Sequence, residues 1–62
     1  MNYKVITNAE NTGLDLVVFE SMEEAESAVE LAKEMFNDAS FEIMQTSEPF
    51  NTTYREWVVA PW

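Results

Sequence analysis

The chain of 62 residues has no cysteine and no histidine. The first absence excludes a disulfide framework and thiolate metal sites, and the second removes the commonest remaining metal ligand. Acid–base chemistry would have to come from carboxylates alone, and a domain this small rarely encloses a substrate pocket. We therefore predict no metal, no cofactor and no enzymatic activity, which leaves binding as the expected mode of action.

Long apolar runs are also missing. None exceeds four residues, as in residues 16–19, which is far shorter than the roughly 18 residues that a membrane-spanning helix needs. No segment has the features of a signal peptide. The sequence thus predicts a soluble, cytoplasmic protein without a membrane partner.

Basic residues are scarce. Only Lys4, Lys33 and Arg55 stand against twelve acidic residues, and the formal net charge is −9. Phosphate contacts require lysine and arginine, so direct binding to nucleic acid is not expected. A charged partner should instead be a protein with a basic surface.

The hydrophobic content, 47%, is sufficient for one folded domain over residues 1–62. Alternating patterns predict strands over residues 3–7, 14–20, 41–46 and 54–60. The spacing of Ala25, Ala28 and Ala32 predicts a helix from residue 22 to about 37. The predicted fold is α+β, of order β-β-α-β-β: a four-stranded, largely antiparallel sheet with one helix packed on one face.

Ser21 and Glu24 have the spacing of a capping box, which predicts the start of that helix, with Glu24 returning a hydrogen bond to the Ser21 amide. On the outer side of the helix, acidic residues follow at three- or four-residue intervals and line one face, with one more just beyond the helix end. These residues form the acidic ridge, the predicted partner-binding surface: Glu23, Glu26, Glu30, Glu34 and Asp38. The alternative is an ordinary solvated face that keeps the protein soluble.

Two tryptophans near the C-terminus, Trp57 and Trp62, form a second candidate surface. Tryptophan is frequent among the residues that dominate interface energies, so either one could anchor a partner or a second copy on the uncovered sheet face. Equally, Trp57 could belong to the core and Trp62 could cover the edge of that core.

The middle third of the chain resembles a known family. The matching positions are Phe19-Glu20-Ser21-Met22-Glu23-Glu24-Ala25, then Ala28, Leu31 and Ala32, then Phe41-Glu42-Ile43. This pattern is similar to that of the small inhibitor of bacterial RNA polymerase made by T7-like phages, and small anti-CRISPR proteins are alike in size and charge. The resemblance implies a phage-encoded host-takeover protein that acts in the host cytoplasm. That family has arginines where this chain has Gln45, Thr46 and Ser47. The resemblance therefore implies the class of function and not the same target.

Our leading hypothesis is an acidic inhibitor or regulator that occupies a basic, nucleic-acid-binding surface of a bacterial enzyme, either RNA polymerase or a nuclease. The ridge would then act as a nucleic-acid mimic. The alternative is a self-associating structural or adaptor module, such as a homodimer, that uses the uncovered sheet face.

Overall fold

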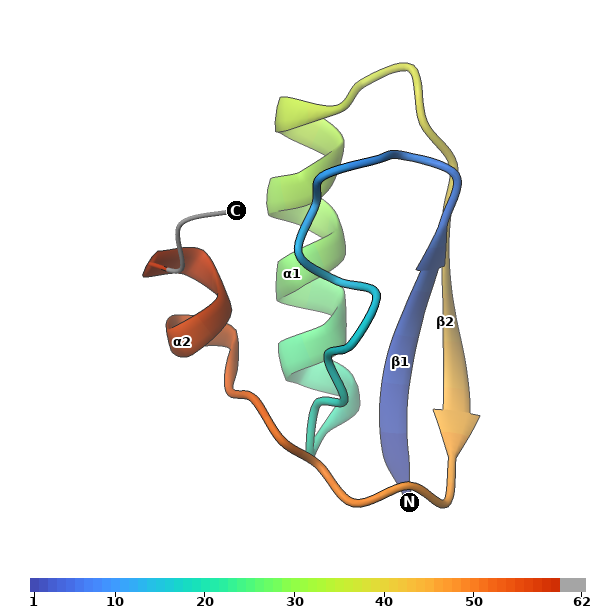
Figure 1. The fold of residues 1–62 in the computed structure, drawn as a ribbon, viewed down its shortest axis with the longest axis vertical. Coiled ribbons are helices and arrows are strands. Elements are labelled where there is room, and N and C mark those ends of the chain that lie inside the picture. The colour runs from blue at the N-terminus through green and yellow to red at the C-terminus, as the bar shows by residue number, and fades with distance from the viewer. Residues whose placement is uncertain (60–62) are drawn as a thin grey trace.

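The fold is α+β, with two strands and two helices in the computed structural model, which describes residues 1–59. In chain order these are β1 (Asn2–Thr7), α1 (Met22–Met35), β2 (Phe41–Thr46) and α2 (Tyr54–Val59). Figure 1 shows α1 between α2 and the two strands, and α1 contacts all three of these elements. The predicted four-stranded sheet with a single helix is therefore wrong, because two of the predicted strands do not form.

Within residues 1–59 the sheet consists of β1 and β2, paired antiparallel from Asn2↔Thr46 to Thr7↔Phe41. The strands predicted over residues 3–7 and 41–46 are confirmed. Val5 pairs with Ile43, and α1 packs against the face that carries them. The opposite face exposes Ile6 and Met44.

Residues 14–20, predicted as a strand, form a turn and an irregular segment. The Val17 amide donates to the Leu14 carbonyl (3.2 Å), which closes the turn. Leu16 is 84% exposed, whereas Leu14 is fully buried. In a strand these two side chains would lie on the same face, so their opposite environments exclude regular alternation.

A side-chain amide replaces the missing strand partner of this segment. Asn51 accepts from the Val18 amide through Oδ1 (2.9 Å) and donates to the Leu16 carbonyl through Nδ2 (2.8 Å). Its own main-chain amide donates to the Val18 carbonyl (3.0 Å). Backbone groups that a sheet would have paired are thus paired by one residue that is distant in sequence.

Residues 54–59, also predicted as a strand, are helix α2; Ala60 lies outside the described residues. The helix begins with a reciprocal capping box. The Glu56 amide donates to Thr53 Oγ1 (3.2 Å), and the Thr53 amide donates to Glu56 Oε1 (3.0 Å). This local signal, Thr-x-x-Glu, outweighs the β-propensity of the aromatic and branched residues between Tyr54 and Val59.

Helix α1 begins as predicted, because Ser21 Oγ accepts from the Glu24 amide (3.3 Å). The predicted return bond is wrong: the Glu24 carboxylate accepts from the Tyr54 amide (2.8 Å), at the first turn of α2. The helix ends at Met35, where the Phe36 amide donates to the Ala32 carbonyl (2.7 Å). Its buried side is formed by small side chains, listed here: Ala25, Ala28, Val29 and Ala32.

The core extends from this side of α1 to α2 and the loop after β1. Trp57 is 1% exposed, and its indole Nε1 donates to the Thr12 carbonyl (2.9 Å). Thr12 Oγ1 in turn accepts from the Leu14 amide (3.1 Å). Between them Gly13 has a positive φ of 74°, a conformation that glycine adopts without the steric cost of a Cβ. The loop is therefore held in place by the indole from α2.

Candidate functional site

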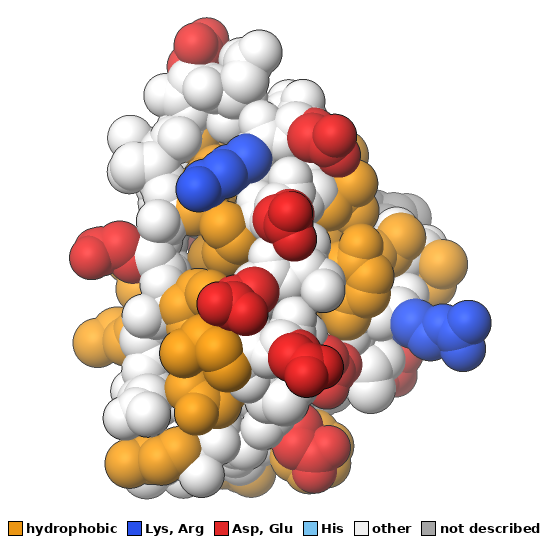
Figure 2. All heavy atoms as spheres, turned by 180° about the vertical axis from the view of Figure 1, so that it is seen from behind, with side chains coloured by type: hydrophobic (Ala, Val, Ile, Leu, Met, Phe, Trp, Pro, Cys, Tyr) orange, Lys and Arg blue, Asp and Glu red, His pale blue; other side chains and the backbone are white. Residues whose placement is uncertain are grey.

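The acidic ridge lies on the exposed side of α1. Glu23, Glu26, Glu30 and Glu34 are all exposed, and Asp38 is exposed just beyond the helix. Figure 2 shows acidic side chains following one another along this face of the molecule. Four residues advance an α-helix by about 6 Å, so the carboxylates are regularly spaced along its axis.

The ridge carboxylates form no ion pair within residues 1–59, although Lys33 lies between Glu30 and Glu34 on the same helix. Among residues 1–59 the one ion pair is Lys4–Glu48 (3.8 Å), and it lies away from α1. No hydrogen bond within this part of the chain engages a ridge carboxylate, whereas Glu24 of the same helix is half-buried and bonded to Tyr54. The ridge carboxylates consequently face solvent as a row of negative charge that Lys33 interrupts.

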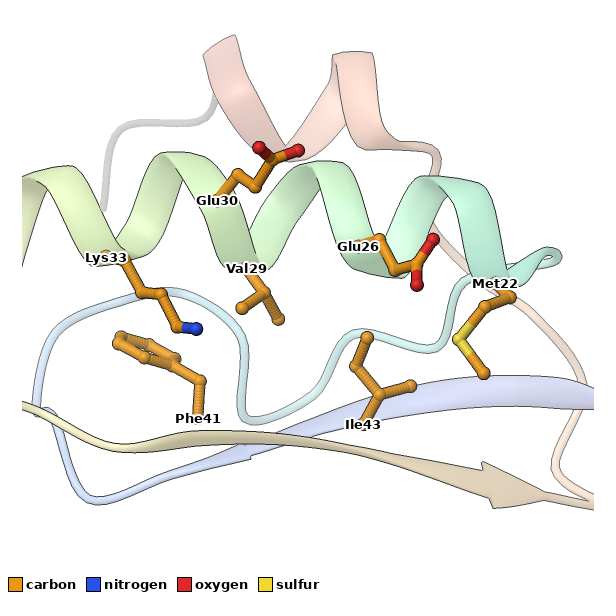
Figure 3. A pocket seen from close by; sticks show the side chains of 7 residues that line it. All are labelled: Met22, Glu26, Val29, Glu30, Lys33, Phe41 and Ile43. Carbon is orange, nitrogen blue, oxygen red and sulfur yellow. The ribbon is translucent and has the colours of Figure 1, made fainter.

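An open groove of about 650 Å³ runs beside the ridge, between α1 and β2. Its apolar floor comes from Val29 on α1 and from Phe41 and Ile43 on β2. Figure 3 shows Glu26 and Glu30 on the helix above this floor, with Lys33 at the end nearest Phe41 and Met22 at the other end. Two members of the ridge therefore also line a concave surface.

The sequence did not predict this groove, and it favoured a domain without a pocket. The apolar patterns of α1 and β2 predict each of these elements separately, but the groove depends on the lateral distance between them. Because no third strand lies beside β2 within residues 1–59, Phe41 and Ile43 are only partly covered. A pattern read along the chain contains no signal for that distance.

The two tryptophans of the second candidate surface have different outcomes. Trp57 lies in the core beside Tyr54, with ring centroids 6.1 Å apart, and so is not exposed for a partner. Its position matches the alternative interpretation of Trp57 as a core residue. Trp62 lies outside the described residues.

Two other kinds of site can be assessed in the same part of the chain. Within residues 1–59 there is no group of three or more acidic side chains arranged to hold a metal ion. None of the helices described is long and apolar enough to cross a bilayer.

Comparison of the chain with protein-family models, with curated proteins and with solved structures found no match. The resemblance to the phage inhibitor of RNA polymerase stays a prediction. The acidic ridge and the groove therefore carry the functional argument.

Proposed function

We propose that the protein is a binding inhibitor or regulator that places its acidic ridge on a basic, nucleic-acid-binding surface of a bacterial enzyme in the cytoplasm. One observation carries this proposal: the ridge carboxylates are exposed on one side of α1, and within residues 1–59 no ion pair or hydrogen bond engages them. Their spacing along the helix is comparable to that of successive phosphates in a nucleic-acid strand. A groove that binds a phosphate backbone could accept the ridge in its place.

The electrostatics of such a complex follow from the net charge of −9. A strongly negative protein is steered toward a positive surface over distances of about 8 Å, the screening length at physiological salt. We expect the association rate to fall steeply as salt is added, because steering acts mainly on that rate. Binding should also compete with DNA or RNA for the same surface.

The proposal is tested by capture from a bacterial lysate, followed by competition with DNA on the purified partner. The test variant combines Glu26→Lys, Glu30→Lys and Glu34→Lys. A matched control makes the same change in net charge at three other exposed positions, with Glu10→Lys, Asp15→Lys and Glu20→Lys. Circular dichroism establishes that both variants are folded.

The proposal would be supported if the wild type and the control captured a nucleic-acid enzyme, the ridge variant did not, and DNA displaced the wild type from that enzyme. An equal loss of capture in both variants would show that binding depends on net charge alone, and would contradict a role for the ridge. Capture that is equal in all three proteins would contradict it as well.

A second candidate, self-association through the outer sheet face, is favoured by the exposure of Ile6 (44%) and Met44 (53%) on that face. Sedimentation equilibrium of the wild type and of Met44→Lys tests it. A dimer that the substitution dissociates would support this candidate, and a monomer at all concentrations would reject it.

A further inference from the structure

The outer edge of β2 has unpaired main-chain groups. Among residues 1–59, β2 pairs with β1 alone, whereas β1 is bonded on its other side through Tyr3. The Tyr3 amide donates to the Phe19 carbonyl (2.9 Å) and the Phe19 amide donates to the Tyr3 carbonyl (2.8 Å). These two bonds determine which main-chain groups of the β1–β2 pair point away from the neighbouring strand.

Both main-chain groups of a strand residue point to the same side, and the side alternates along the strand. The amide and carbonyl of Tyr3 point away from β2, so those of its register partner Gln45 point away from β1. By the same alternation, the amides and carbonyls of Ile43, opposite Val5, and of Phe41, opposite Thr7, point away from β1. The amides and carbonyls of Phe41, Ile43 and Gln45 therefore face outward as a row of donors and acceptors.

This edge lacks the features that usually prevent further pairing. The register is continuous over six pairs, without a bulge, and β2 contains neither proline nor lysine. The apolar groove adjoins the same edge, with Phe41 and Ile43 belonging to both. A strand added at the normal spacing of about 4.8 Å would place alternate side chains in that groove, against Val29.

The charges around the edge indicate which strand fits. Glu26 and Glu30 border the groove on the α1 side, Lys33 lies at its end beside Phe41, and Glu42 lies on the opposite face of β2, so three carboxylates surround the edge against one cation. Basic side chains of an added strand would thus meet Glu26 on the groove face or Glu42 on the other face, except beside Lys33. A second copy of this chain, itself carrying a net charge of −9, would be repelled.

We propose that the edge of β2 and the adjoining groove bind an extended segment of the partner as a third strand, one in which basic and apolar residues alternate. This inference rests on the proposed function in one respect, the basic character of the partner. Main-chain hydrogen bonds would provide affinity, while the groove and its glutamates would provide specificity.

The probe is a capped peptide of about seven residues that alternates lysine with valine, the length needed to span β2. Binding is followed by amide chemical shifts in NMR. A peptide with glutamate in place of lysine controls for charge, and one N-methylated at alternate residues controls for main-chain pairing. We expect saturable shifts at Phe41, Ile43 and Gln45 with the first peptide alone.

Gln45→Pro tests the edge from the side of the protein. The Gln45 amide points away from β1, so proline removes an outward donor without removing a bond between the strands. Relative to Gln45→Ala, which keeps the amide, we expect binding at least about fivefold weaker. Should proline perturb the circular dichroism spectrum, the N-methylated peptide tests the same pairing on the unaltered protein.

The inference would be overturned if the lysine peptide bound both Gln45 variants equally, if the N-methylated peptide bound as well as the unmethylated one, and if the shifts were confined to α1. That result would leave the proposed function intact. Equal binding of the glutamate peptide would overturn the assignment of a basic partner. Dimerisation that Gln45→Pro abolishes would assign the edge to a second copy and would also overturn it. Edge binding of the lysine peptide with no effect of the ridge variant on capture would instead reject the proposed function alone.

Discussion

Replacement of Trp57 by phenylalanine is expected to destabilise the protein strongly, because the indole joins α2 to the loop after β1. Trp57 and Thr12 are each 1% exposed, and the bond from Nε1 to the Thr12 carbonyl is 2.9 Å long. Phenylalanine fills most of the same space but cannot donate. The Thr12 carbonyl would then be buried without a partner.

The expected magnitude follows from two contributions. An orphaned buried acceptor costs about 1 to 3 kcal/mol. The volume that the smaller ring leaves empty adds about 1 kcal/mol. A domain of this length has a free energy of unfolding of about 3 to 9 kcal/mol, so the total of about 2 to 4 kcal/mol would remove a large part of it.

Urea unfolding followed by circular dichroism measures this effect, with Val59→Ala as the control on the same helix. Val59 is 80% exposed, so its truncation should change the free energy of unfolding by no more than about 0.5 kcal/mol. A loss as small in Trp57→Phe as in the control would refute the role of the indole in the core. Trp57 would then again be a candidate for the interface of a self-associating module.

Two further predictions test the segment that replaces the expected strand, by the same urea measurement. Leu14→Ala should lower the free energy of unfolding by about 2 to 5 kcal/mol and Leu16→Ala by no more than about 0.5 kcal/mol, because Leu14 is fully buried and Leu16 is exposed. Similar losses in the two variants would instead favour the predicted strand. Asn51→Ala should cost about 1 to 2 kcal/mol, since the Val18 amide and Leu16 carbonyl lose their partner. Asn51→Asp, which keeps the acceptor for Val18, should recover part of that loss, and equal losses in both would contradict the pairing.

The successes and failures of sequence-based prediction have a physical origin. Helix α1 was predictable because its apolar spacing and its Ser21 cap agree. In residues 54–59 these signals conflict: the residue types favour a strand, while Thr53 and Glu56 form a helix cap. The strand prediction for these residues rests on periodicity alone, and the capping box is the sequence signal that predicts the helix instead.

Residues 14–20 contained no comparable local signal. Their conformation depends on Asn51, more than thirty positions further along the chain, whose side chain pairs with Leu16 and Val18. The predicted site was affected in the same way. The ridge follows from spacing within one helix, whereas the burial of Trp57 and the groove beside β2 depend on elements brought together only by folding.

The glutamates of α1 separate into those that the fold uses and those that it does not. Glu24 is bonded to the Tyr54 amide and joins the two helices, whereas Glu26, Glu30 and Glu34 have no hydrogen bond or ion pair within residues 1–59. Like charges at this spacing destabilise a helix by a few tenths of a kcal/mol per pair, and Glu34 lies at the end of α1 where the helix dipole disfavours negative charge. Lysine at positions 26, 30 and 34 exchanges one row of like charges for another, but it places opposite charges beside Glu23 and Asp38 and suits the helix dipole at position 34. The fold should therefore remain about as stable. A loss of partner binding in the ridge variant can then be attributed to the binding surface and not to unfolding.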